Sequence, residues 1–320
     1  MSEFVIPEVR DLARTVVEQH FALPRAAELK NTFSKLFSYH LGCLESGARF
    51  ETSSILVTGR SRAGKTKEIR NLLSQFNQSQ AMLPTGEPAR FVECVLSGKG
   101  TWKDLGRDTA RAIGYPLGEN SRLTQAEIWN VVVREAKLSG VIGIHYDETQ
   151  HIFFTSSEKE RLTILDSFKT LMKSHEWPLM LIFSGVPELT NFLKQEQQLF
   201  NLVHQVPFND ISLPDDLETV HEIVCSFAML GNAEVEEKLR TQNFYERLVA
   251  GSAYRWGLVC VLVVDAISEA KIRSDTHLRL EHFVDSWVAK TSMSKAASPY
   301  FHSNFKAAYR IDHPFIEKLS

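Results

Sequence analysis

Residues 55–66 decide the fold class, and they read Ile-Leu-Val-Thr-Gly-Arg-Ser-Arg-Ala-Gly-Lys-Thr. The apolar start predicts a strand, and the residues from Thr66 onward have the pattern of a helix. Between them stands G-x-x-x-x-G-K-T, the phosphate-binding loop, whose two glycines let several backbone N–H groups point at one anion. The following helix adds its positive N-terminal end at the same place. A glycine turn that matches by chance is the alternative, and the flanking periodicity argues against it.

This loop predicts ATP and Mg²⁺ as cofactors. Lys65 is placed to reach the β- and γ-phosphates, and the Thr66 hydroxyl is a candidate Mg²⁺ ligand. The expected nucleotide-binding residues in the loop are Gly59, Arg60, Ser61, Arg62, Ala63, Gly64, Lys65 and Thr66.

Composition limits the class of protein. The chain has 320 residues, of which 43% are apolar and 23% charged, as in an ordinary globular protein with a sizeable core. A net charge of −3 argues against coating nucleic acid by bulk electrostatics, although a local basic patch remains compatible with it. The four cysteines contain no C-x-x-C pair, so neither a zinc site nor a disulfide framework is expected. Without a signal peptide or an apolar run of membrane-spanning length, we expect a cytoplasmic protein with no membrane partner.

Residues 51–213 alternate strands with helices, which predicts an α/β nucleotide-binding domain with a parallel sheet flanked by helices. Strands are expected at 55–57, 90–96, 141–146 and 179–183. Helices are expected at 102–113, 124–138 and 157–174, in addition to the helix that starts at Thr66.

Three further segments flank this domain. Residues 1–50 read as a helical N-terminal segment. No strand pattern recurs after Leu213, and a helical lid subdomain is expected over 214–290. Residues 291–320 carry scattered aromatics, which predict a partner-binding tail; packing of these aromatics against the lid is the alternative. The helices of the lid are expected near 216–230, 234–249, 255–270 and 279–290.

An acidic pair, Asp147-Glu148, directly follows the apolar strand 141–146. A nucleotide hydrolase needs one carboxylate near Mg²⁺ and usually a second that activates the attacking water. We predict Asp147 as the metal-associated acid and Glu148 as the general base. An acidic turn after a strand is the alternative, and the phosphate loop upstream argues for the functional interpretation.

Ser184 follows the strand 179–183. In a parallel sheet this strand should lie between the strands that carry the first two motifs, so a polar group at its tip would face the γ-phosphate. Ser184 is therefore a candidate for sensing the phosphate or positioning the attacking water. A serine that merely opens a turn is an equal alternative.

The order of these motifs, followed by a helical C-terminal lid, resembles that of an AAA+ P-loop NTPase. The sequences of three segments resemble, more specifically, those of the TniB family of bacterial transposition ATP-binding proteins, which are related to TnsC and MuB. The likeness covers roughly residues 20 to 270. The segments are Asp147-Glu148-Thr149-Gln150-His151, Ser157 to Arg161, and Phe183-Ser184-Gly185-Val186-Pro187-Glu188-Leu189; Ala22-Leu23-Pro24-Arg25 looks like the family's lead-in to the loop.

The resemblance implies an ATP-dependent regulator of DNA transposition. Such proteins assemble on double-stranded DNA as a homo-oligomeric ring or filament. They recruit a DDE transposase and a target-selection protein, and they disassemble when ATP is hydrolysed. Two rivals stay open. One is a signalling or loader-type AAA+ switch that acts on a protein without DNA, and the other is a small-molecule P-loop kinase.

The sequence departs from the family at the arginine finger that usually completes such a site in trans. The matching segment is Gln198-Leu199-Phe200-Asn201-Leu202-Val203, so the arginine position holds Leu202, and no arginine occurs between Arg161 and Arg240. We therefore expect slow ATP hydrolysis, or a finger supplied by Lys194, His204 or a partner.

Two basic features carry weaker predictions. Arg255 starts a lid helix, where a second sensor arginine would contact the γ-phosphate; a solvated arginine beside the core Trp256 is the alternative. Lys103, Arg107 and Arg111 share one helix face, with Lys99 just before them. They are candidates for DNA-phosphate contacts, and a solvated helix face is the more frequent explanation.

Overall fold

The computed structural model describes residues 4–96, 101–118, 122–154 and 156–309. They form two compact units. The sheet unit contains residues 24–60 and 65–208, and the helical unit joins residues up to 23 with 61–64 and those from 209 onward. The chain therefore passes into the helical unit and back within the predicted phosphate loop.

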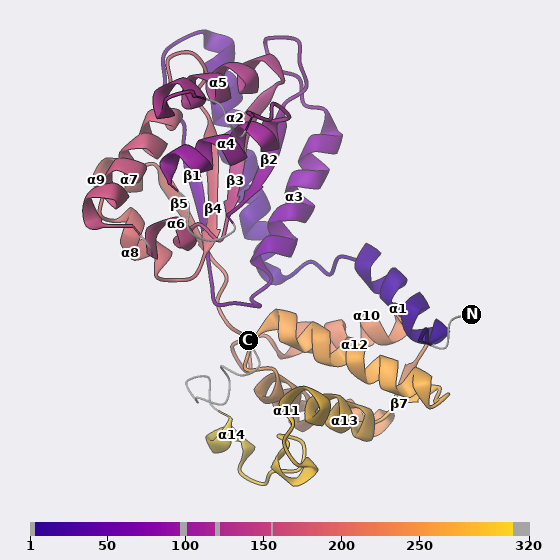
Figure 1. Ribbon diagram of the computed structural model, residues 1–320. Helices are drawn as coiled ribbons and strands as arrows, with labels where there is room; N and C mark the ends of the chain where they lie inside the picture. Colours follow the sequence, from indigo (N-terminus) through magenta and orange to yellow (C-terminus); the bar gives the residue numbers. More distant parts are fainter. Residues whose placement is uncertain (1–3, 97–100, 119–121, 155, 310–320) are drawn as a thin grey trace. The chain divides into compact units, whose positions relative to one another are not determined.

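The sheet unit is built on five strands that all pair in parallel, in the order β2-β3-β4-β1-β5 (Figure 1). The predicted position of β4, between β1 and β3, is confirmed. The carboxyl ends of these three strands meet at one sheet edge, where ligands bind in open α/β sheets. The strands are β1 (Ser54–Thr58), β2 (Arg90–Val95), β3 (Val141–Asp147), β4 (Met180–Gly185) and β5 (Val203–Pro207).

Strand β5 is absent from the prediction. It is an edge strand that pairs with β1 alone among the described strands, and most of its side chains are exposed or half-buried. Its sequence, Val-His-Gln-Val-Pro, has only two β-branched apolar residues and ends in proline, which is tolerated at an edge. Neither an apolar run nor a clear alternation marked it.

Helix boundaries in the sheet unit follow capping chemistry. Thr101 closes a capping box with Asp104 before α4, and Gly114 ends that helix at a positive φ of 102°. Thr124 and Ser157 cap α5 and α7 in the same way. The helices are α2 (Pro24–Ser46), α3 (Lys65–Ser79), α4 (Trp102–Ile113), α5 (Gln125–Leu138), α6 (Gln150–Phe154), α7 (Glu158–Met172), α8 (Leu189–Leu193) and α9 (Gln197–Phe200).

Aromatic contacts show which helices cover each face of the sheet. On one face, Phe33 of α2 and Phe76 of α3 pack edge-on against Phe91 of β2, with ring centroids 5.1 and 5.5 Å away. On the other face, Phe168 of α7 packs against Tyr146 of β3 and Phe183 of β4. Helices α4 and α5 join this second layer through a Trp102–Trp129 stack. The unit is thus a three-layer α/β/α sandwich.

Replacing Gly143 by alanine is expected to destabilise the sheet unit. A Cβ at this β3 position would overlap the Phe91 ring and lie 2.8 Å from the Met180 carbonyl oxygen. Overpacking of this kind costs about 1–3 kcal/mol of unfolding free energy. Gly42→Ala is the matched control: open space surrounds that position in α2, and alanine there favours the helix. Denaturant unfolding followed by circular dichroism measures the effect. A Gly143→Ala variant with the wild-type denaturant midpoint would contradict the packing argument.

The helical unit is built around a large apolar core, in which Trp256, Phe283 and Trp287 are fully buried. Residue Leu12 of α1 belongs to the same core. Within the described residues, no single helix is long and apolar enough to cross a membrane; α11 and α12 pass that test only as a pair bent by 107°. The helices are α1 (Pro7–Glu18), α10 (Leu217–Leu230), α11 (Gln242–Gly251), α12 (Trp256–Ile272), α13 (Leu280–Thr291) and α14 (Phe305–Ala308), with short 3₁₀ turns η1 (Glu237–Leu239) and η2 (Lys295–Ala297).

The predictions of a helix over 234–249 and of no strands beyond Leu213 are wrong. Strands β6 (Glu234–Val235) and β7 (His277–Leu278) form a short parallel pair, and α11 begins only at Gln242. The segment Glu234-Val-Glu-Glu-Lys-Leu239 is rich in good helix formers, so local propensity favoured a helix. Pairing with a segment more than 40 residues away overrides that propensity.

Three of the four aromatic residues in the described part of the predicted tail pack on the helical core, which is the alternative that the sequence left open. Tyr300, Phe305 and Tyr309 are each 5% exposed. Arg247 of α11 donates to the Pro299 and His302 carbonyl oxygens at 2.6 and 3.1 Å and lies over the Phe305 ring. The fourth aromatic, Phe301, is 56% exposed. Residues 310–320, with Phe315, lie outside the described residues.

Candidate functional site

The loop between β1 and α3 has backbone features that side chains other than glycine would disturb. A Cβ on Gly59 would overlap the carbonyl oxygen of Phe208, and Gly64 has a positive φ of 93°. Arg60, Ser61 and Arg62 are exposed, whereas Ala63 is buried. The glycines at these two positions therefore serve the close approach and the turn that the motif predicted.

Lys65 opens α3, and its side chain curls back along the loop. Its Nζ donates to the carbonyl oxygens of Gly59 and Arg60 at 2.7 and 3.0 Å, and the residue is 6% exposed. The ammonium group is thus held beside the loop backbone, where a phosphate cradled by that backbone would lie.

Residues 61–64 of the loop belong to the helical unit. There the Arg62 carbonyl oxygen accepts a hydrogen bond from the Gly257 N–H, at 2.9 Å, in the first turn of α12. A Cβ on Gly257 would approach that oxygen to 2.6 Å. Arg255 occupies the N-cap position of the same helix and is 6% exposed. Its predicted contact with the γ-phosphate stays a prediction.

The acidic pair lies at the carboxyl end of β3. Thr66 donates to the Asp147 carboxylate, with its hydroxyl 3.0 Å from Oδ2 and 3.3 Å from Oδ1. Asp147 is 4% exposed, whereas Glu148 is half-buried with a positive φ of 55°. A left-handed backbone conformation is uncommon for glutamate, and residues held in such conformations cluster at functional sites. The structure therefore brings both motifs to one place.

Ser184, at the end of β4, is hydrogen-bonded to Asp147. Its hydroxyl donates to Asp147 Oδ1 at 2.6 Å and lies 2.8 Å from His145 Nε2. Both Ser184 and His145 are fully buried. The predicted adjacency of the three strand ends therefore exists, and the serine hydroxyl is directed at the carboxylate.

The residues present fit Mg²⁺. Hydroxyl and carboxylate oxygens are the hard ligands that this ion prefers, and adjacent ligands of an octahedral site at 2.0–2.1 Å lie about 3 Å apart. The Thr66 Oγ1 to Asp147 Oδ2 separation is 3.0 Å. Thr66 and Asp147 are thus the residues that would hold the ion or its water shell.

Four polar neighbours of this site have no role in the predictions from sequence: Gln150, Arg70, Glu93 and His145. The Gln150 side-chain amide donates to the Glu148 carboxylate, and its oxygen accepts from the Val186 N–H at 3.4 Å. Arg70 donates to Glu93, which faces His145 Nδ1 across 3.6 Å. The signal in the sequence was His145 inside an otherwise apolar strand and Gln150 shortly after it.

Burial lowers the pKa of His145 to about 4, an effect that nearby Asp147 opposes and Arg70 reinforces.

Comparison with known proteins identifies the architecture. Residues 48–193 match a family model described as an AAA domain, and no curated protein sequence matches the chain. Among solved structures, Cdc6p of Pyrobaculum aerophilum has 15% identity and a TM-score of 0.59 over 83% of this chain and 67% of that one. The ORC1 protein of Aeropyrum pernix in complex with DNA has 15% identity and a TM-score of 0.60 over 91% and 71%. The ORC2 protein of that organism has 13% and 0.57 over 85% and 71%.

The chain has the AAA+ P-loop NTPase fold. Identities this low show the fold alone. With the AAA domain, the fold indicates a nucleotide-binding protein, and AAA+ domains are typically ATPases.

In the sheet unit, the segment expected to carry an arginine finger forms α9 and the start of β5. Leu202 lies between them, and its carbonyl oxygen accepts from the Ser54 N–H at 2.8 Å. Lys194 lies over the Phe200 ring at 5.7 Å, and His204 is exposed on β5. Which group completes the site in trans stays a prediction.

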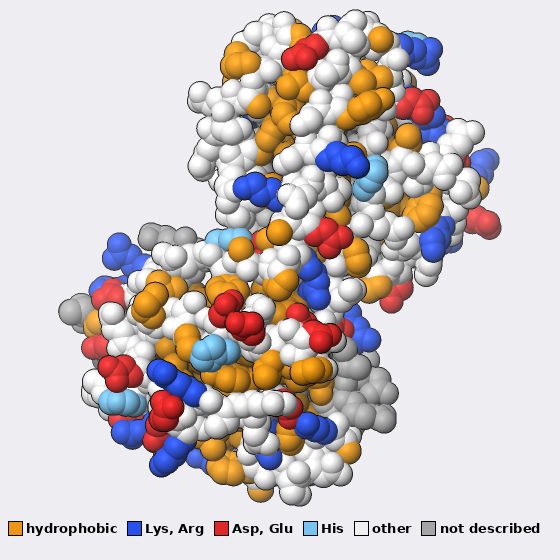
Figure 2. All heavy atoms as spheres, turned by 180° about the vertical axis from the view of Figure 1, so that it is seen from behind, with side chains coloured by type: hydrophobic (Ala, Val, Ile, Leu, Met, Phe, Trp, Pro, Cys, Tyr) orange, Lys and Arg blue, Asp and Glu red, His pale blue; other side chains and the backbone are white. Residues whose placement is uncertain are grey.

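The candidate DNA-contact face of α4 is partly neutralised by neighbouring acids. Arg111 pairs with Asp108 at 2.7 Å, and Arg107 lies 3.6 Å from Asp104. Figure 2 shows the molecule from the side opposite to the view in Figure 1, and there too basic and acidic side chains of the described residues are interspersed. Lys99 lies outside the described residues. These ion pairs favour the solvated-face alternative.

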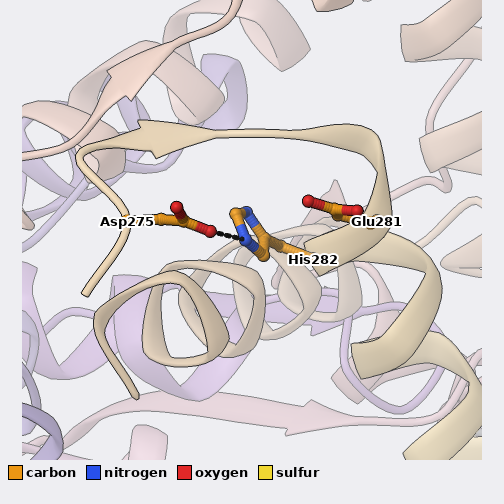
Figure 3. Close-up of side chains that lie close together, drawn as sticks. All are labelled: Asp275, Glu281 and His282. Atoms are coloured by element: carbon orange, nitrogen blue, oxygen red, sulfur yellow. Dashed lines mark hydrogen bonds and ion pairs between the residues drawn. The ribbon is translucent and has the colours of Figure 1, made fainter. Parts of the chain in front are cut away.

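A second polar cluster, Asp275, Glu281 and His282 in the helical unit, has the spacing of a metal site (Figure 3). His282 Nδ1 accepts the Arg279 N–H at 3.0 Å, so Nε2 carries the proton that it donates to Asp275 Oδ2 at 3.0 Å. Both ring nitrogens are therefore used in fixing the start of α13. We assign this cluster to helix capping.

Proposed function

We propose that the protein is an ATPase that binds ATP with Mg²⁺ at the edge formed by the loop 59–66 and the ends of β3 and β4. The observation that supports it most strongly is the Thr66 hydroxyl on the Asp147 carboxylate, at 3.0 Å. Eighty residues of sequence separate the two motifs, and the parallel sheet joins them. This contact favours the functional interpretation over an acidic turn without function, because it joins a carboxylate to the hydroxyl of the phosphate loop.

Each residue then has a role in hydrolysis. The loop N–H groups and Lys65 bind the β- and γ-phosphates, and Thr66 and Asp147 orient the metal. Bound Mg²⁺ neutralises charge on these phosphates. Glu148 accepts the proton of the attacking water, and Gln150 holds its carboxylate. Arg255 is proposed as a further contact of the γ-phosphate.

Hydrolysis is proposed to be slow in the isolated chain because Leu202 replaces the finger arginine. A trans arginine contributes roughly 10³-fold or more to phosphoryl transfer. The alternatives are Lys194, His204 or a partner's cation. Brisk hydrolysis that survives alanine at Lys194 and His204 would contradict this view.

We further propose that the ATPase regulates DNA transposition as a homo-oligomer on double-stranded DNA, with a DDE transposase and a target-selection protein as partners. The TniB-like sequences of residues 147–151 and 183–189 support this proposal. One protein of the same fold, ORC1 of Aeropyrum pernix, has been solved in complex with DNA. The second candidate is a protein-directed switch without DNA, which the ion-paired α4 face and the net charge of −3 favour.

Co-sedimentation with duplex DNA tests the choice. The purified chain is compared with ATP, ADP and a non-hydrolysable analogue at moderate salt, because phosphate contacts weaken as salt rises. Assembly on DNA only with triphosphate supports the transposition regulator, provided that Lys65→Ala abolishes it. Triphosphate binding without DNA-dependent assembly supports the protein-directed switch.

The same assay locates the DNA contacts. Lys103→Gln with Arg111→Gln removes two charges from α4, and Lys30→Gln with Lys35→Gln removes two exposed charges from α2 as the matched control. Loss of DNA retention in the first pair alone would assign the contact to α4. Equal retention by both pairs would assign α4 to solvent.

A further inference from the structure

A line of polar side chains crosses the sheet on the face that α2 and α3 cover. Glu93 on β2 is paired with His145 on β3, and His145 is paired with Ile182 on β4, two residues before Ser184. Side chains two apart on a strand point to the same face, so Glu93, His145 and Ser184 share one face. Arg70 of α3 closes the line by donating to both Glu93 oxygens, at 2.8 and 2.9 Å.

The directions of these hydrogen bonds follow from counting protons. A serine hydroxyl has one proton, and Ser184 donates it to Asp147 Oδ1 at 2.6 Å. The 2.8 Å contact between Ser184 Oγ and His145 Nε2 must therefore be donated by the histidine. His145 thereby fixes the hydroxyl in the rotamer that serves Asp147.

The two oxygens of the Asp147 carboxylate have different surroundings. Oδ1 accepts from Ser184 and from the Glu148 N–H, at 2.6 and 3.1 Å. Oδ2 makes the shorter contact with the Thr66 hydroxyl, at 3.0 Å. One oxygen is thus anchored to the protein, and the other faces the second candidate Mg²⁺ ligand.

We propose that Ser184 and His145 are positioning residues that orient the Asp147 carboxylate toward Mg²⁺, and that Ser184 is not the sensor of the γ-phosphate. The inference rests on the proposed Mg²⁺–ATP site and assigns the serine a different task within it. A hydroxyl that donates its only proton to Asp147 has none left for a phosphate oxygen or an attacking water. Partners that orient a metal-binding carboxylate typically affect metal affinity 10–100-fold.

The test measures binding rather than hydrolysis. A fluorescent ATP analogue is held at fixed concentration with the full chain, and Mg²⁺ is titrated. Ser184→Ala is expected to raise the half-saturating Mg²⁺ concentration about 10-fold or more, while metal-free binding of the analogue in EDTA stays at the wild-type level. His145→Leu shifts it in the same direction, and His145→Gln, which restores an N–H donor, recovers part of the loss.

Tyr146→Phe is the matched control. Tyr146 is the next residue on β3, is fully buried, and has a 3.0 Å hydrogen bond to Thr109 on the opposite face of the sheet. It therefore reports the cost of losing a buried hydrogen bond without touching Asp147. Thermal unfolding of every variant shows whether it is folded. If Ser184→Ala unfolds, the comparison of folded His145→Leu with folded His145→Gln still decides, because only the leucine variant lacks an N–H donor to Ser184.

Two results would overturn the inference while leaving the proposed function intact. The first is Ser184→Ala with wild-type Mg²⁺ dependence and slower hydrolysis, as expected of a phosphate sensor. The second is Tyr146→Phe with the same shift as Ser184→Ala, as expected of a general stability effect. A wild-type chain that binds no nucleotide with Mg²⁺ would instead contradict the proposed function itself.

Discussion

Lys65→Ala is expected to lower the affinity for ATP about 100-fold or more and to abolish hydrolysis. The Nζ group lies beside the loop backbone through Gly59 and Arg60 and exchanges these carbonyl partners for phosphate oxygens. A hydrogen bond to a charged group contributes about 1.5–3 kcal/mol, and every 1.4 kcal/mol is tenfold in affinity. Equilibrium binding of a fluorescent ATP analogue measures the loss directly.

Lys67→Ala is the control for that experiment. Lys67 is on the same helix, two residues on, with an exposed side chain. It carries the same charge, so its replacement reports the general electrostatic effect on an anionic ligand. Equal affinities of the Lys65 and Lys67 variants would contradict the assignment of the loop.

Glu148→Gln is expected to separate binding from hydrolysis. Glutamine has nearly the same size but cannot accept the proton of the attacking water, so phosphate release should fall about 10²–10⁴-fold. The phosphate contacts of the loop do not involve this side chain, and ATP affinity should therefore stay near the wild-type value. Single-turnover phosphate release and equilibrium binding give the two quantities.

The environment of Glu148 makes the substitution conservative. The backbone already has a positive φ of 55° there, and Gln150 and His151 lie close to the carboxylate. Glu188→Gln, at an exposed position before α8, is the matched control for removing one negative charge. A Glu148→Gln chain that hydrolyses ATP at the wild-type rate would remove Glu148 from the mechanism.

The parts of the fold that the sequence predicts are those fixed by local signals. Strands β1, β3 and β4 are continuous apolar runs because helices cover both of their faces. Helix α4 begins after Thr101 and ends before Gly114, as capping chemistry indicates. The parallel topology then places the carboxyl ends of β1, β3 and β4 at one edge, which brings Thr66 and Asp147, the two predicted metal-associated residues, together.

What the sequence does not predict depends on partners far along the chain. Strand β5 is stabilised by pairing with β1, and β6 by pairing with β7, with little local preference in either. The same holds within the site. Arg70, Glu93 and His145 are on three different elements, and only the strand register shows that they lie in one line with Ser184.

A structure determined with Mg²⁺ and a non-hydrolysable ATP analogue tests the central claim most directly. The account predicts β- and γ-phosphate oxygens within hydrogen-bond distance of Lys65 Nζ and of the loop N–H groups. It also predicts Mg²⁺ density next to Thr66 and Asp147, with Ser184 still donating to Asp147. Nucleotide density away from residues 59–66, or none at saturating analogue, would contradict the account.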